Sequence, residues 1–322
     1  MTNPPDRPED AASSVPVVFI ASCGRSGSTL LDLALGSVPG MVSTGELRHL
    51  WTRGLQQRRL CGCGTPVPDC PHWSAVIDAI GGYPRTEGAL DHHAVEHDMQ
   101  AVARTRHTRR LLAGRDDETV ARLHDLSART YRAVREVTGA SVVVDSSKMP
   151  ADAALAATAP GVDVHLVHLT RDPRAVAWSW RRPKMMTDVV PPRPISTISA
   201  NRSARQWLSW NPLIERVGQH AASVTRVRYE DLIADPAATL ERIVSATGLA
   251  TAPIADMVGD GSISIRGSHT VAGNPARFDT GTVSLKLDDR WRDDQPTLDR
   301  WQATAITAPL LRRYGYRAAR RA

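Results

Sequence analysis

The run Val15-Pro-Val-Val-Phe-Ile-Ala-Ser22 constrains the fold more than any other segment. It is apolar, rich in β-branched residues, and ends just before Gly24, which predicts a buried strand followed by a tight loop. Helical composition follows at once, from Ser28 to Leu35. Further buried strands are predicted at 42–44, 141–144, 162–170 and 224–228. Strands that alternate with helices indicate an α/β fold with a P-loop-type parallel β-sheet flanked by helices.

The chain has 322 residues, of which 42% are hydrophobic, enough for a sizeable core. We predict a single α/β domain over 15–316, a disordered tail at 1–14 and a basic tail at 317–322. Residues 71–138 lack strand patterns, and their apolar residues recur at helical spacing, so we predict a helical insertion packed against the core. Further helices are predicted at 199–222 and 236–247.

Two stretches are predicted to be irregular. Residues 182–195 contain four prolines, and 259–282 is rich in Gly and Ser. The proline-rich stretch, which includes Met185 and Met186, is a candidate for an adaptable apolar lid over an acceptor. The arginine-rich end from Arg312 onward is expected to be solvated and partly frayed.

Charge and hydropathy narrow the class of protein. Lys and Arg number 40 against 34 Asp and Glu, a net charge of +6 that suits an anionic ligand but does not predict nucleic-acid binding. No signal-peptide pattern is visible and no run reaches the ~20 apolar residues of a membrane span, so we expect a cytoplasmic protein. The chain has only three lysines, Lys148, Lys184 and Lys286. Coding bias explains this scarcity, although Lys is also retained where a compact ammonium is needed.

The segment Ser22-Cys-Gly-Arg-Ser-Gly-Ser-Thr-Leu30 lies between the predicted strand and helix, where a phosphate-binding loop is expected. Its glycines allow successive N–H groups to converge on an anion, and the helix that follows adds its positive end. A nucleoside-triphosphate loop has Gly-Lys-Ser/Thr, whereas this chain has Gly27-Ser28-Thr29 and carries its cation earlier, at Arg25. We therefore expect a shorter anion without obligatory Mg²⁺; the alternative is a plain structural turn.

A second anchor follows the predicted strand at 162–170. Arg171 lies at its carboxyl end, where open α/β sheets bind ligands, and Pro173 begins the next helix. Ser179 lies eight residues after Arg171, two turns into that helix. Together they can hold a second phosphate, apart from the first. The alternative is an Arg–Asp turn with a capping role.

In this order, the two anchors resemble those of sulfotransferases that use 3′-phosphoadenosine 5′-phosphosulfate (PAPS). The matching motifs are Cys23-Gly-Arg-Ser-Gly-Ser-Thr-Leu30 and Leu169-Thr-Arg-Asp-Pro-Arg-Ala-Val-Ala-Trp-Ser179. The resemblance continues through Val227-Arg-Tyr-Glu-Asp-Leu232, Gly273-Asn-Pro-Ala-Arg277 and Tyr314-Gly-Tyr316, and so covers most of the chain in segments.

The resemblance implies a role for each anchor residue. The 5′-phosphosulfate would be held by Gly24, Arg25, Ser26, Gly27, Ser28 and Thr29. The 3′-phosphate would be held by Arg171 and Ser179, with Arg277 as a looser match. Tyr229 would lie near the adenine; the alternative for this tyrosine is plain core packing. The expected product is adenosine 3′,5′-bisphosphate, and no metal is required.

Catalytic residues are also implied. Lys148, which follows the strand end at 141–147, resembles the catalytic lysine of the tyrosylprotein branch and would stabilise the leaving group together with Arg25. Glu46 would take the acceptor's proton, with His49 as the rival base. Sulfuryl transfer resembles phosphoryl transfer in its loose transition state, so positioning and positive charge do most of the work. The expected acceptor is a hydroxyl or phenol of a small molecule or glycan, and a homodimer is compatible with the sequence.

The segment Cys61-Gly-Cys-Gly-Thr-Pro-Val-Pro-Asp-Cys-Pro-His72 leaves three interpretations open. Its three thiols and an imidazole are zinc ligands, but neither the C-x-C nor the C-x-H spacing is typical of a zinc site. A disulfide or redox-sensitive pair, and a rigid loop with incidental thiols, are the alternatives, and we expect no metal. Cys23 is expected to be a packing residue.

Two other functions were weighed. A P-loop nucleotide kinase or NTPase conflicts with Ser28 at the lysine position. A polyanion-binding protein without chemistry would rest on net charge and the arginine-rich end alone, and we expect no nucleic-acid partner.

Overall fold

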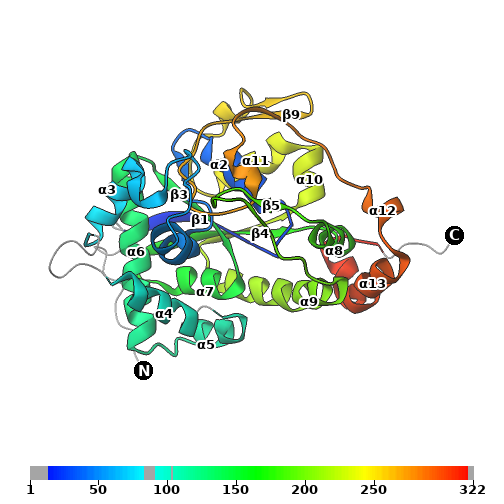
Figure 1. Cartoon of the computed structure of the whole chain (residues 1–322), viewed down its shortest axis with the longest axis horizontal. Helices are drawn as coiled ribbons and strands as arrows, with labels where there is room; N and C mark the ends of the chain where they lie inside the picture. The colour runs from blue at the N-terminus through cyan, green and yellow to red at the C-terminus, as the bar shows by residue number, and fades with distance from the viewer. Residues whose placement is uncertain (1–13, 83–90, 103, 318–322) are drawn as a thin grey trace.

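The computed structural model describes residues 14–82, 91–102 and 104–317. A five-stranded sheet, with all neighbours parallel and in the order β2-β3-β1-β4-β7, forms its centre (Figure 1). The strands are β1 (Val15–Ser22), β2 (Met41–Ser43), β3 (Val142–Lys148), β4 (Val162–Thr170) and β7 (Ser223–Arg228). The predicted α/β class is confirmed, and all five predicted strands are present with small shifts at their ends.

The central strand β1 shows why this sheet is buried on both faces. Val15, Val17 and Phe19 point into one hydrophobic cluster, whereas Val18 and Ile20 point into another. All five side chains are at most 1% exposed. Because both faces need an apolar side chain, the strand has a continuous apolar run instead of an alternating one.

Helices cover the two faces (Figure 1). One face packs against α2 (Ser28–Gly36) and α11 (Pro236–Ser245). The other packs against α6 (Glu118–Thr138), α7 (Pro150–Thr158) and the end of α9 (Ala200–Val217). At the far end of the sheet, α8 (Pro173–Arg181) and α13 (Thr297–Leu311) pack on each other and on α9. Two short α-helices, α10 (Tyr229–Ala234) and α12 (Trp291–Asp294), lie in the C-terminal part of the described chain.

The segment predicted as a helical insertion is helical where the structure describes it. It contains α3 (Pro71–Ala79), α4 (His92–Val102), α5 (Thr108–Leu112) and α6. Trp73, Leu111 and Leu123 belong to the same buried cluster as Phe19 of β1, so these helices share the core of the sheet.

Short strands occur within both stretches that were predicted to be irregular, although most of 182–195 lies outside any strand or helix. The Gly- and Ser-rich stretch contributes to an antiparallel sheet of β8 (Val258–Gly259), β9 (Ser262–Ile265) and β10 (Gly281–Ser284). In the proline-rich stretch, β5 (Met185–Met186) pairs with β6 (Arg193–Pro194). Near the C-terminus, Tyr314 and Tyr316 are buried against Trp207 instead of frayed, because their rings complete a small aromatic cluster.

Short helical turns complete the described chain. They are η1 (Leu47–His49), the π-helix η2 (Leu50–Gln56), η3 (Val67–Asp69), η4 (Thr105–His107), η5 (Gly218–His220), η6 (Ala252–Ile254), η7 (Pro275–Phe278) and η8 (Arg312–Tyr314). The predicted terminal tails lie outside the described residues except for Ser14 and Arg317. Among the described residues, no helix has the length and apolar content needed to cross a bilayer.

Candidate active site

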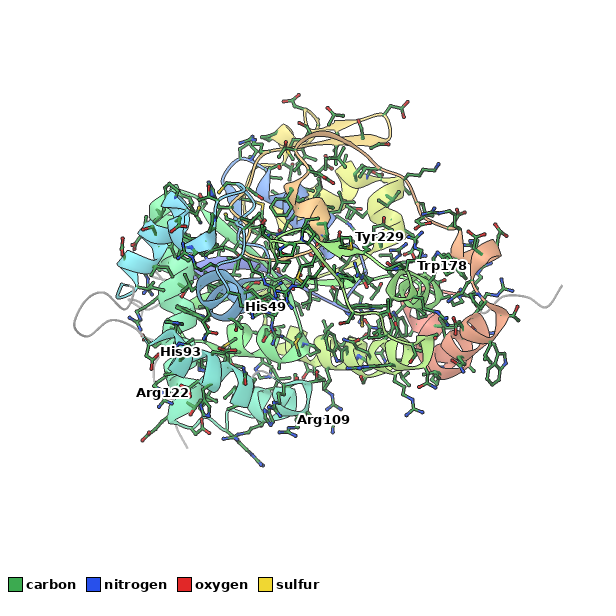
Figure 2. The ribbon with its side chains drawn as sticks, viewed as in Figure 1. His49, His93, Arg109, Arg122, Trp178 and Tyr229 are labelled. Carbon is green, nitrogen blue, oxygen red and sulfur yellow. The ribbon has the colours of Figure 1, made fainter. Side chains whose placement is uncertain are left out.

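The carboxyl ends of β1, β3 and β4 open onto a cavity of about 570 Å³, within the usual size range of ligand sites. His49 and Tyr229, both labelled in Figure 2, belong to its wall. The lining residues used below are Gly24, Arg25, Gly27, Ser28, Thr29, Glu46, His49, Arg53, Lys148, Arg171, Ser179, Trp180, Lys184, Asp188, Tyr229 and Arg277.

The loop after β1 has the form of an anion site. Arg25 and Gly27 adopt left-handed φ angles of 69° and 92°, and α2 begins directly afterwards, so the N–H groups of its first turn are free of helical partners. The Oγ of Ser26 and the Nε of Arg25 are buried without a hydrogen-bond partner among the described residues. Buried polar atoms normally have partners, so these groups fit a bound anion.

Two glycines of this loop are required by close packing. A Cβ on Gly27 would lie 2.2 Å from Cδ2 of Tyr229, and one on Gly24 would lie 2.7 Å from Cζ2 of Trp180. The guanidinium carbon of Arg25 stacks 4.8 Å from the centroid of Trp180. Our sequence reading did not select Trp180, because nothing in the sequence indicated that α8 would return to this loop.

Arg171 lies at the same cavity, beside the loop. Its Nη1 donates to the carbonyl of Arg25 at 3.2 Å, and its guanidinium carbon lies 4.4 Å from the centroid of Tyr229. Its Nε is buried without a partner among the described residues. Ser179 of α8 also lines the cavity. The structure therefore brings the two predicted anchors together, with Tyr229 in contact with both.

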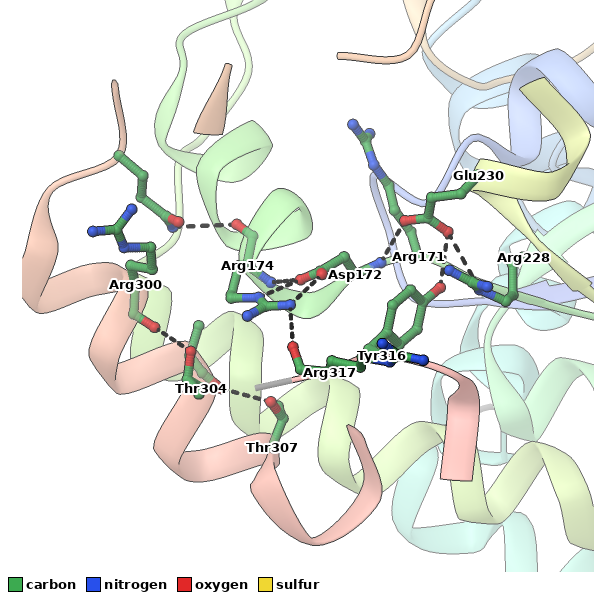
Figure 3. Close-up of polar contacts among 12 residues, drawn as sticks. Arg171, Asp172, Arg174, Arg228, Glu230, Arg300, Thr304, Thr307, Tyr316 and Arg317 are labelled. Carbon is green, nitrogen blue, oxygen red and sulfur yellow. Dashed lines mark hydrogen bonds and ion pairs between the residues drawn. The ribbon is translucent and has the colours of Figure 1, made fainter. Parts of the chain in front are cut away.

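Hydrogen bonds hold the backbone around Arg171 (Figure 3). The carboxylate of Asp172 caps α8 by accepting from the N–H of Arg174. The Asp172 N–H donates to Glu230 at 3.0 Å, and the Tyr316 hydroxyl donates to the same carboxylate at 3.0 Å. The capping role thus belongs to Asp172, which leaves the guanidinium of Arg171 to face the cavity.

Glu46, Lys148 and His49 form a second group in the cavity. The Lys148 ammonium donates to Glu46, and Nε2 of His49 lies 3.5 Å from the other carboxylate oxygen. Burial opposes ionisation of Glu46, but the charge of Lys148 and its hydrogen bond to the carboxylate outweigh burial and lower the pKa of Glu46 to about 2. Burial, and then the charge of Arg53, lower the pKa of His49 well below its ordinary value. At neutral pH Glu46 is therefore a carboxylate and His49 a neutral imidazole.

Arg277 has different contacts from those expected of a 3′-phosphate ligand. Its side chain is 2% exposed and donates to the carbonyls of Thr270 at 2.6 Å and Leu60 at 2.5 Å. It also lies 3.5 Å from the carboxylate of Asp188. The guanidinium therefore ties two loops and Asp188 together, and the structure shows no contact between it and Arg171.

Lys184 is a cavity residue that the sequence reading did not assign to the site. Burial lowers its pKa, and the charges of Arg25, Arg182 and Arg171 lower it further, whereas Asp288 opposes them. Cations gather in this way where an anion compensates them. The scarcity of lysine was the one sequence signal that could have found it.

The chain matches a family model described as the sulfotransferase family over residues 16–253. Similar solved structures include the sulfotransferase domain from the curacin biosynthetic pathway, 18% identical with a TM-score of 0.54, covering 95% of this chain and 99% of that chain. Another is the sulfotransferase domain from the Synechococcus PCC 7002 olefin synthase, 22% identical with a TM-score of 0.50, covering 92% and 95%.

At these identities the two structures show the likeness of fold, and no curated protein matches the chain. The family model is the stronger finding, because it spans more than half of the sequence and includes the loop at 24–29, Lys148 and Arg171. The chain belongs to the sulfotransferase family.

Proposed function

We propose that this sulfotransferase moves a sulfuryl group from PAPS to a hydroxyl or phenol of a small molecule or glycan. One observation carries the choice of donor: two separate anion-binding groups, the loop at 24–29 and Arg171, line one cavity. The buried, unpartnered atoms of Arg25, Ser26 and Arg171 fit a ligand with an anionic group at each end. A ligand with a single anion would leave one group uncompensated.

Each group has a proposed binding role. Gly24, Arg25, Ser26, Gly27, Ser28 and Thr29 would hold the 5′-phosphosulfate. Arg171 and Ser179 would hold the 3′-phosphate, and Lys184 would add positive charge beside them. Tyr229 would lie near the adenine, and its contacts with Gly27 and Arg171 keep the two binding groups at a fixed separation. Arg277 would support the wall of the cavity through its hydrogen bonds to Thr270 and Leu60.

The proposed transfer step uses the second group of the cavity, which contains Glu46, Lys148 and His49. The acceptor oxygen forms a bond to sulfur while the bond between sulfur and the bridging oxygen breaks, which leaves adenosine 3′,5′-bisphosphate. Glu46 would take the acceptor's proton, and Lys148 and Arg25 would stabilise the negative charge that builds on the bridging oxygen. Because Lys148 pairs with Glu46, the base and the cation are adjacent at the place where the acceptor would attack. No metal is assigned to this step.

The donor is tested by thermal unfolding with two nucleotides. Adenosine 3′,5′-bisphosphate should raise the melting temperature more than adenosine 5′-monophosphate, because only the former reaches both binding groups; binding at 100 times Kd adds about 2.7 kcal/mol of stability. In Arg171→Ala this difference should disappear while the response to the monophosphate persists. Equal shifts from both nucleotides in the wild-type chain would rule out the two-ended site.

The acceptor is tested separately. Candidate alcohols, phenols and glycans are incubated with the protein and isotope-labelled PAPS, and mass spectrometry follows the gain of one sulfo group. Glu46→Gln serves as the matched inactive control. A compound that the wild-type chain sulfates and Glu46→Gln does not would identify the acceptor class.

A further inference from the structure

Four side chains with metal-binding atoms meet outside the cavity. Cys61 and Cys63 lie in one tight turn, Cys70 precedes α3, and His269 lies in the loop after β9. Their three Sγ atoms and the imidazole ligand atom all lie within 4.8 Å of one another. The segments are about 200 residues apart in sequence, since Cys70 and His269 are separated by 199 positions.

Three of the six separations among these atoms are close to those around one tetrahedral ion. With Zn–S of about 2.3 Å and Zn–N of about 2.0–2.1 Å, tetrahedral ligands lie ~3.8 Å apart for two sulfurs and ~3.6 Å apart for sulfur and nitrogen. The observed distances are 3.7 Å between the sulfurs of Cys63 and Cys70, and 3.7 and 3.3 Å from Nδ1 of His269 to Cys61 and Cys70. A disulfide would need about 2.05 Å, and the cysteines are free.

We propose that Cys61, Cys63, Cys70 and His269 bind one Zn²⁺ as a structural site. Three thiolates and one imidazole in a tetrahedral arrangement form a donor set that selects zinc over the harder divalent ions. The sequence placed His72 beside the cysteines, with a spacing that did not suit zinc. The fold supplies His269 instead, which removes the objection to the C-x-H spacing, and the geometry brings the two cysteines of the C-x-C turn to the same cluster.

The surroundings hold these ligands in place. Gly64, at φ 85°, closes the turn by donating to the carbonyl of Cys61 at 2.8 Å, so that both thiols of the turn face the same side. The indole N–H of Trp73 donates to the carbonyl of His269 at 2.6 Å, and the ring of His72 stacks on that of His269 at 4.8 Å. Cys61 and Cys70 are buried, whereas Cys63 is exposed and gives an ion a path of entry.

The ion would fasten two loops that support the active site. The N–H of Gly62 donates to the carbonyl of Thr270 at 2.9 Å, and two residues further on, Ala272 accepts from the N–H of Glu46 at 3.2 Å. Arg277 bonds the carbonyls of Thr270 and Leu60, one from each loop. Zinc therefore acts as a positioning element for the backbone of Glu46, outside the transfer step.

The first experiment measures metal in the wild-type chain, purified under reducing conditions without an immobilised-metal step. Elemental analysis should give about one zinc per chain, and X-ray absorption at the zinc edge should show three sulfurs near 2.3 Å and one nitrogen near 2.0–2.1 Å. Four reactive thiols and no zinc after incubation with Zn²⁺ would overturn the proposal. So would a mass two hydrogens lower that maps to a Cys63–Cys70 disulfide. Neither readout depends on PAPS, so this proposal can fail while the proposed function stands.

Variants then identify the ligands. His269→Gln and Cys70→Ser should each lose at least about tenfold in zinc affinity. The matched control Cys23→Ser should keep the full zinc content, because its side chain lies outside the cluster. His72→Gln removes only the ring that stacks on His269, so it should lose less zinc affinity than His269→Gln. Loss of zinc in folded His72→Gln together with retention in His269→Gln would contradict the assignment. Should His269→Gln not fold, the X-ray absorption of the wild-type protein still decides the ligand set.

Discussion

At the scale of single residues, Lys148 and Glu46 are the pair that we propose for the transfer step. Lys148 ends β3 with a left-handed φ of 74°, a conformation that costs a residue other than glycine about 1–3 kcal/mol. Arg25 is in the same region, at φ 69°. Both strained residues, Arg25 and Lys148, line the cavity. Backbone strain of this kind is found mainly at functional sites, where the surrounding structure holds the residue in place.

The ion pair between Glu46 and Lys148 leads us to predict that Glu46, and not His49, acts as the base. Glu46→Gln should lower kcat about 10²–10⁴-fold, the usual effect of losing a general base, whereas His49→Gln should have a much smaller effect. Because the pKa of Glu46 is about 2 and that of His49 is also depressed, kcat/KM should show no acid limb between about pH 5 and 8. Steady-state rates of both variants across this range check the prediction. Unaltered rates in Glu46→Gln, with loss in His49→Gln, would assign the base to His49.

At the scale of elements, the loop between β1 and α2 depends on the side chains that pack over it. Gly27 combines a left-handed φ with contact against Tyr229, and Gly24 lies against Trp180. The strand, loop and helix are visible in the sequence, because a continuous apolar run, glycines and helical composition follow one another. The packing of the aromatic rings on the glycines is not visible there: Tyr229 was expected near the adenine, but its contact with Gly27, and that of Trp180 with Gly24, depend on how α10 and α8 pack.

Comparing Gly27→Ala with Gly114→Ala separates two losses of stability: the loss from a left-handed backbone and the loss from a clash with Tyr229. Gly114 is the matched control, because it also has a positive φ, 61°, but nothing lies within 4 Å of its added Cβ. Gly114→Ala should lose about 1 kcal/mol, whereas Gly27→Ala should lose at least about 2 kcal/mol more, as in other overpacked sites. It should also weaken the binding of adenosine 3′,5′-bisphosphate. Denaturant unfolding and nucleotide titration measure the two effects, and equal losses in both variants would contradict the role of Tyr229.

At the scale of the whole molecule, the cavity is assembled from distant segments around one sheet edge. Its walls include residues from β3, α8, α10, the turn before η1, Arg171 directly after β4, and the loop that ends at η7. The partly buried ion pair of Glu46 and Lys148 joins two of these segments across 102 positions. Its contribution to stability should therefore depend on pH.

The sign of that dependence follows from the lowered pKa of Glu46. Its folded value is about 2 and its ordinary value 4.5, so the unfolded chain binds more protons between these limits. The stabilisation is fully present above about pH 4.5 and is lost as the pH falls toward 2. Glu46→Gln should therefore flatten the stability profile of the chain in this window, by up to about 3 kcal/mol. Unfolding free energies of wild type and variant from pH 3 to 6 test this, and parallel profiles would contradict it.

The sequence by itself determined the parallel sheet, since the central strand β1 is a continuous apolar run of the kind that a sheet buried on both faces requires, and the other four strands alternate with helices along the chain. It also determined the loop at 24–29 and Arg171, because a site at a strand's carboxyl end is built from residues adjacent in sequence. Only the tertiary structure decided the partners of Arg277, the place of Lys184 and the meeting of His269 with the three cysteines. These contacts join segments far apart along the chain, and no local pattern of polarity or spacing encodes which of them will meet.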